Sequence, residues 1–225
     1  MKALDQNQIR IRLITCFSAF ILGYINAHGV LFAVGALVSP QTGNLVHMAI
    51  SLGSGDATRL IGTILIFTGF LLGCFFSTSL FGRMKDQRKE FFVTWSIFFL
   101  PIFLNWLLIG IIPTWAVKFS LSFISGVGLC FFRKIGNIEI NNNIVTGNMR
   151  FIGNALFSVL FRGDKSKALI FWTFTLATFL FFLGALVLTL LSGLGSANAL
   201  LVIVIIGLIP YLIGLGLARE SSQGQ

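Results

Sequence analysis

Charged residues are scarce in this sequence, and acidic residues are the scarcest of them. Only 10% of the 225 residues are charged, with seven acids against 16 basic residues, whereas soluble domains carry about 25% charged residues. The acids lie almost entirely outside the apolar stretches, which argues against a carboxylate pair inside a membrane. Two histidines without neighbouring carboxylates do not make a metal site.

Signatures of catalysis and of covalent cross-linking are also lacking. The sequence contains no H-E-x-x-H, no G-x-S-x-G and no Walker-type loop, so we expect neither an enzyme nor a cofactor. The three cysteines, Cys16, Cys74 and Cys130, lie in apolar stretches and form no C-x-x-C pair. They are expected to be small buried hydrophobic residues instead of a disulfide framework.

Long hydrophobic stretches are abundant. Hydrophobic residues make up 56% of the chain, 25 of them phenylalanine, and the mean hydropathy is +0.93. A helix of about 20 apolar residues crosses a hydrocarbon core of about 30 Å. We therefore predict an all-α, polytopic membrane protein with one membrane domain over residues 1–225. The six expected transmembrane helices are Leu13–Val38, Leu60–Gly82, Phe91–Ile112, Trp115–Phe132, Ala168–Leu191 and Asn198–Ala218.

The basic residues set the expected topology. With six crossings and a cytoplasmic N-terminus, 14 of the 16 basic residues fall on the cytoplasmic side, and only Arg59 and Lys118 fall outside. Both termini are then cytoplasmic, and the net charge of +9 is explained without a nucleic-acid partner. Seven crossings with an external N-terminus stay open, whereas eight would place the cluster at 83–89 outside, against the positive-inside rule.

A three-residue motif occurs twice, at Thr42-Gly43-Asn44 and at Thr146-Gly147-Asn148, 104 residues apart. A short apolar segment and then a Gly-Asp pair follow each copy, at Gly55-Asp56 and Gly163-Asp164. The chain therefore divides into repeats of about 10–112 and 113–219. Since each repeat has three crossings, the second is expected to lie inverted relative to the first, as is frequent in secondary transporters.

Each motif is expected to precede a short broken or re-entrant helix, Leu45–Leu52 in the first repeat and Met149–Phe161 in the second. Because Thr and Asn are good N-cap residues, Thr42 or Asn44 is expected to cap the first helix and Thr146 or Asn148 the second. A helix N-terminus favours anions. Two interpretations stay open: half-helices that point at a central site, or capped turns at the membrane surface.

Several polar residues accompany the motifs. Asn26 and His28 lie in the first span, where they contact a solute or proton, or form hydrogen bonds between helices. His47 lies one turn into the first short helix. Glu139 and Asn143 belong to a polar run that is either a solvated loop or a re-entrant segment. The candidate substrate-binding residues are Asn26, His28, Gln41, Thr42, Gly43, Asn44, His47, Glu139, Asn143, Thr146, Gly147 and Asn148.

Two segments resemble those of the YoaK-like family of bacterial integral membrane proteins. They are Gly23–Ala27 followed by Ser39–Asn44, and Arg133–Gly136 followed by Val145–Asn148. The resemblance implies a fold and a bacterial cytoplasmic membrane, not a substrate. The family usually has Asp where this chain has Asn26, and Gln-Asn where it has Gly128-Leu129. Loss of that acid argues against proton coupling at this position.

The sequence thus favours a small-solute transporter or permease in a lipid bilayer, built on the two broken helices. A non-transporting scaffold or accessory subunit is the alternative, supported by the scarcity of charge in the spans. Either class is compatible with a homo-oligomer.

Overall fold

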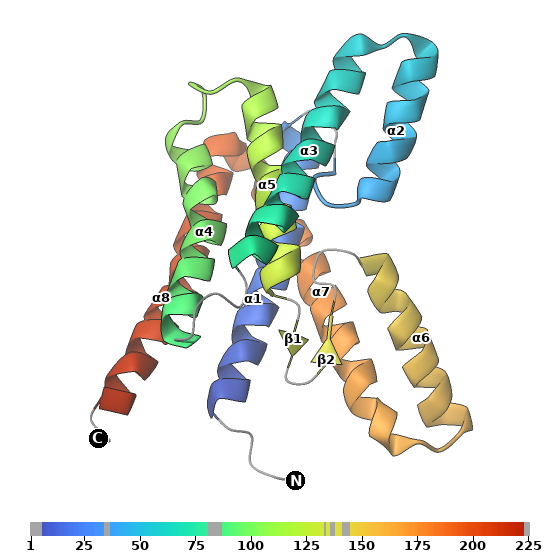
Figure 1. Cartoon of the computed structure of the whole chain (residues 1–225), viewed down its shortest axis with the longest axis vertical. Helices are drawn as coiled ribbons and strands as arrows, with labels where there is room; N and C mark the ends of the chain where they lie inside the picture. The colour runs from blue at the N-terminus through green and yellow to red at the C-terminus, as the bar shows by residue number, and fades with distance from the viewer. Residues whose placement is uncertain are drawn as a thin grey trace.

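The computed structural model describes residues 6–33, 37–80, 87–132, 134–135, 138–140 and 145–222. Helices dominate these ranges, and a ribbon of two short strands is the exception (Figure 1). The α-helices are α1 (Gln6–Phe32), α2 (Gln41–Ser54), α3 (Ala57–Leu80), α4 (Gln87–Leu107), α5 (Thr114–Phe131), α6 (Val145–Phe161), α7 (Ala168–Leu191) and α8 (Gly195–Ser222). The strands β1 (Lys134–Ile135) and β2 (Ile138–Glu139) pair antiparallel, and the 3₁₀ turns η1 (Lys165–Lys167) and η2 (Ser192–Leu194) flank α7.

Four apolar stretches among the described residues are long enough to cross a membrane. They are Ile14–Phe32, Ala57–Leu80, Thr114–Phe131 and Lys165–Leu212, and the shorter apolar stretch Phe92–Leu107 accompanies them. The expected all-α membrane class is therefore confirmed. Six separate crossings stay a prediction, because the last stretch counts as one by length and composition.

The helices form a central pair with two arms and a lateral pair (Figure 1). Helices α1 and α5 occupy the centre, and α4 and α8 lie together on one side of them. The first arm is the hairpin of α2 and α3, and the second arm is the hairpin of α6 and α7. Corresponding helices of the two halves run in opposite directions in Figure 1. In that view α1 and α4 run upward, whereas α5 and α8 run downward. Likewise α3 runs downward, whereas α7 runs upward.

The second arm crosses the first helix of the chain at two glycines. A Cβ atom placed on Gly23 of α1 would lie 1.9 Å from the carbonyl oxygen of Phe181, and one placed on Gly184 of α7 would lie 2.0 Å from that of Phe20. No larger residue fits at either position without moving backbone. Glycine therefore sets the close approach of α1 and α7.

The first arm crosses α5 in the same manner. A Cβ atom on Gly126 of α5 would lie 2.2 Å from the carbonyl oxygen of Phe70, and one on Gly73 of α3 would lie 2.2 Å from that of Phe123. Corresponding contacts on α1 and α5 are separated by 103 residues, and those on α3 and α7 by 111 residues. Both arms thus cross a central helix through a glycine and a phenylalanine carbonyl on each side.

An aromatic cluster fills the space between α4 and α8. Trp95 is fully buried, and its indole N–H donates to the carbonyl of Gly207 at 2.9 Å. Phe98 and Phe132 pack against it with ring centroids 5.4 Å away. Indoles need a hydrogen-bond partner when buried, and a carbonyl of the neighbouring helix supplies it.

Candidate functional site

The chain loses helical structure after α1, inside the bundle. The sequence predicts a span that continues to Val38, but α1 ends at Phe32, and Val38 and Ser39 are non-helical and fully buried. Such backbone is tolerated at membrane depth only where the protein satisfies its polar groups. The prediction of a continuous helix to Val38 is therefore wrong at its C-terminal end.

Asn26 of α1 holds this segment. Its amide Nδ2 donates to the carbonyl of Leu22 at 2.8 Å and to the hydroxyl of Ser39. The backbone N–H of Ser39 donates in return to Oδ1 of Asn26 at 3.1 Å. Asn26 is only 2% exposed. Its amide therefore supplies, inside the bundle, a hydrogen-bond partner for backbone that is not in a helix.

Ser122 of α5 holds the same segment from the other central helix. Its hydroxyl lies 2.9 Å from the carbonyl oxygen of Val38 and 2.6 Å from that of Ile66 in α3. A hydroxyl carries one proton, so the two carbonyls share it. Ser122 therefore joins α5, α3 and the entry to α2 at one buried point.

The first Thr-Gly-Asn motif lies within the first turn of α2, not before it. The helix begins at Gln41, and Pro40 is the N-cap residue without a side-chain capping bond. The prediction that Thr42 or Asn44 caps the helix is therefore wrong. Asn44 is 3% exposed and donates to the carbonyl of Leu37 at 3.2 Å and to Oε1 of Gln41 at 3.1 Å. Proline fits this cap because it has no N–H to satisfy.

The remaining residues of the first motif face outward. Thr42 is exposed, and no atom lies within 4 Å of a Cβ placed on Gly43. His47 is exposed as well, and its Nδ1 accepts a hydrogen bond at 3.0 Å from Arg59 of α3. His47 therefore links the two helices of its arm and does not reach the cluster around Asn26.

The second Thr-Gly-Asn motif repeats this arrangement in part. It lies inside α6, which begins at Val145, so the prediction of a cap by Thr146 or Asn148 is wrong here too. Asn148 is 1% exposed, Thr146 is exposed and Gly147 is half-buried. In both motifs the asparagine is the buried member.

The polar run before the second motif is only partly described. Glu139 is exposed at the end of the short ribbon, whereas its neighbour Ile140 is 2% exposed and packs near Phe174 of α7. Asn143 lies outside the described residues. The ribbon therefore occupies, in the second half, the position between central helix and arm that the segment 37–40 takes in the first.

His28 lies apart from Asn26, on the face of α1 that meets α8. Its Nε2 shares a hydrogen bond of 3.0 Å with the hydroxyl of Ser196, and Tyr24 donates to the carbonyl of Ala199 at 2.6 Å. Asn26 and His28 thus do not form one site. Asn26, Gln41 and Asn44 do come together, around the segment that begins at Leu37.

The two Gly-Asp pairs form matching turns at the tips of the arms. Gly55 and Gly163 have φ of 72° and 66°, a left-handed conformation that glycine adopts without strain. Asp56 and Asp164 each accept a hydrogen bond from a backbone N–H in the next helical turn, at 3.0 and 3.1 Å. The hydrogen bond from the Ser166 side chain holds the pKa of Asp164 below its usual value, and nearby Lys167 acts in the same direction.

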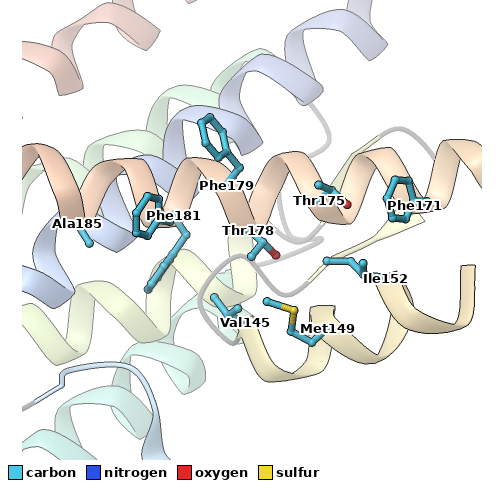
Figure 2. A pocket seen from close by; sticks show the side chains of 10 residues that line it. Val145, Met149, Ile152, Phe171, Thr175, Thr178, Phe179, Phe181 and Ala185 are labelled. Carbon is cyan, nitrogen blue, oxygen red and sulfur yellow. The ribbon is translucent and has the colours of Figure 1, made fainter. Parts of the chain in front are cut away.

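A groove of about 700 Å³ lies between α6 and α7 (Figure 2). Its lining is apolar except for the hydroxyls of Thr175 and Thr178, which have no hydrogen-bond partner among the described residues. In Figure 2 it extends along α7 from Phe171 to Ala185, with Met149 of α6 on the opposite wall. A groove of this chemistry suits hydrocarbon better than a charged solute.

Metal chemistry finds no support in the described part of the chain, where no group of three or more His, Cys, Asp or Glu could hold an ion.

Ser39 and Ser122 belong to the cluster around Asn26, but the sequence did not predict them as site residues. Ser39 directly precedes Pro40, and a serine beside a helix-breaking proline in an apolar stretch is a usable signal. Ser122 carries no comparable signal, because small residues at helix contacts are common.

A sequence profile of one family covers residues 14–213, which is most of the chain. The chain belongs to the DUF1275 family. The members of this family are described as proteins of unknown function. No match was found among curated proteins or among solved structures. The YoaK-like resemblance stays a prediction, because the matching family does not carry that name.

Proposed function

We propose that the chain is a small-solute transporter or permease of a bacterial cytoplasmic membrane, with both termini inside and no enzymatic activity. Two repeats of three crossings, about 10–112 and 113–219, lie inverted in the bilayer in this proposal. The observation that carries it is the buried, non-helical pair Val38 and Ser39 ahead of α2, held by Ser122 and Asn26. Broken backbone of this kind lies beside the substrate site in many secondary transporters.

The inverted repeat has independent support. Corresponding helices run in opposite directions in Figure 1, and the two crossings use equivalent glycine contacts. The apolar stretch Lys165–Leu212 has 48 residues and contains α7 together with much of α8. Since about 20 residues cross the hydrocarbon core, this stretch supplies two crossings, and α4 supplies the sixth.

In this arrangement α2 and α6 are the re-entrant helices. They have 14 and 17 residues, and both begin toward the middle of the molecule in Figure 1 and run away from it in opposite directions. Their N-terminal N–H groups favour an anionic or carbonyl-bearing solute. The buried asparagines of the two motifs, Asn44 and Asn148, are the residues that we expect to orient this solute.

The test is binding and flux with the purified protein in vesicles. A metabolite panel is first screened by thermal shift, and uptake of each compound that binds is then measured. Asn44→Ala and Asn148→Ala should lower uptake at least tenfold, about 1.4 kcal/mol in apparent binding. Asn198→Ala is the matched control, because Asn198 is exposed and its amide donates locally, to the carbonyl of Leu194 in the η2 turn just before α8.

Gln41→Leu serves where an asparagine variant fails to fold, since Gln41 is half-buried and its side chain bonds Asn44; it too should lower uptake. The proposal is wrong if no compound binds, or if the Asn44→Ala/Asn148→Ala double variant takes up a bound compound as fast as the parent. A non-transporting scaffold or accessory subunit is then the better interpretation. The absence of Asp and Glu from the four apolar stretches favours that second candidate.

A further inference from the structure

The groove between α6 and α7 has the dimensions of a lipid chain. From Phe171 to Ala185 it follows about 14 residues of α7, or roughly 21 Å at the helical rise. One leaflet of the hydrocarbon core is about 15 Å deep. With a volume of about 700 Å³ and an apolar lining, the groove accommodates an extended hydrocarbon chain along its length.

One end of the groove is basic. Arg162, Lys165 and Lys167 are exposed in the turn between α6 and α7, with Asp164 as the single acid among them. Lys167 precedes the groove residue Phe171 by four positions, which is one helical turn or about 6 Å. The turn therefore places an excess of positive charge within lysine's reach of the end of an apolar groove.

We propose that this groove binds one acyl chain of an anionic phospholipid, whose phosphate is held by the basic residues of the α6–α7 turn. Charge complementarity selects the occupant, because a zwitterionic lipid would gain little from the excess of cations. The α2–α3 turn makes the contrast: Arg59 is its basic residue, and its guanidinium already donates to His47. The lipid site concerns the second arm alone, and it does not depend on transport.

The experiment uses spin-labelled phosphatidylglycerol and phosphatidylcholine with the full chain in vesicles. Electron paramagnetic resonance measures the motionally restricted fraction of each lipid. The native protein should restrict phosphatidylglycerol in preference to phosphatidylcholine. Lys167→Gln should lower that preference about fivefold, as expected for one basic residue at a membrane surface. Arg59→Gln, which removes a cation from the first arm, should leave the preference unchanged.

A second pair of variants tests the groove itself. Ala185→Phe fills its end and should remove one restricted lipid per protein, whereas Ala197→Phe, at an exposed position on α8, should not. Equal restriction of the two lipids by the native protein would overturn the proposal, as would equal losses from Lys167→Gln and Arg59→Gln. If Ala185→Phe instead turns a dimer into a monomer in light scattering, the groove is a subunit contact. Lys167 is exposed, so its variant keeps the proposal testable if Ala185→Phe does not fold.

Discussion

The two arms of the molecule share a backbone plan and differ in chemistry. Each arm is a hairpin that begins with a Thr-Gly-Asn helix, turns at a left-handed glycine and crosses a central helix of the other half of the chain. The first arm is entered through the buried residues Val38 and Ser39, which bond to Ser122 and Asn26. The second is entered past a two-stranded ribbon, and its turn carries three cations where the first carries one.

This difference shows which features the fold requires of both halves. The close helix crossings and the turns are the same in both arms. Both depend on glycine, because a larger residue would separate the crossing helices or strain the left-handed turn. The side chains that bond the residues ahead of the arm are not repeated. At the 103-residue spacing of the glycine contacts on α1 and α5, Asn26 corresponds to Leu129, which cannot form these hydrogen bonds. The halves therefore agree in architecture and differ in the side chains that bond the segment ahead of the arm and in the charge of the arm's turn.

The largest effect is expected at the crossings. Gly23→Ala and Gly126→Ala each place a methyl group about 2 Å from a carbonyl oxygen of the crossing helix, which should destabilise the protein by about 3 kcal/mol, the upper end for overpacking. Unfolding in detergent, followed by circular dichroism, measures both losses. Equivalent crossings require similar losses at the two positions.

Gly53→Ala is the matched control for these variants. Gly53 lies in α2 with no atom within 4 Å of the added methyl group, so alanine should stabilise the helix by about 0.5–1 kcal/mol. If Gly126→Ala behaves like Gly53→Ala while Gly23→Ala unfolds the protein, the arms do not cross their central helices in equivalent ways.

A smaller loss is expected from Asn26→Leu, which tests what is particular to the first arm. The variant leaves the buried N–H of Ser39 without its partner, at a cost of about 2 kcal/mol. The same unfolding assay measures it. Asn198→Leu changes an exposed asparagine and should stay within about 0.5 kcal/mol. Similar stabilities of the two variants would show that the entry segment does not depend on Asn26.

The smallest effect concerns pH and the tip of the second arm. The pKa of Asp164 is lowered in the folded protein, so its contribution to stability is present above the unfolded pKa of about 3.9. That contribution is lost as the pH falls through the lower folded pKa. Hydrogen exchange at the amide of Ser166 should therefore speed up in that acidic window, after correction for the intrinsic rate. Asp164→Asn should abolish this pH dependence, and a dependence that survives the substitution would assign it to another group.

Much of the fold follows from the sequence. Hydrophobic length predicted the helical membrane class. The repeated Gly-Asp dipeptides were recognised as part of the repeat, and the structure places them at the two arm tips, where Gly55 and Gly163 are left-handed. These features depend on local composition and on glycine's backbone freedom, which a single sequence displays directly.

The site was harder to predict because its contacts join residues far apart in the chain. Asn44 was a candidate site residue. The sequence did not show that it would bond Leu37 and Gln41 instead of capping the helix. An N-cap and a first-turn asparagine have the same sequence signature, and the true cap, Pro40, forms no side-chain bond. Ser122 meets Val38 across 84 residues, a contact that no local pattern encodes.

The glycine crossings also set an order for biosynthesis. The residues of the α3–α5 crossing, Gly73 and Gly126, are synthesised 53 positions apart, whereas Gly23 and Gly184 of the α1–α7 crossing are separated by 161 positions. At about 5–20 residues per second, roughly 10 to 30 s pass between the synthesis of Gly23 in α1 and that of Gly184 in α7. During that interval the Gly23 face of α1 has no α7 to pack against, so the α1–α7 crossing forms after the α3–α5 crossing.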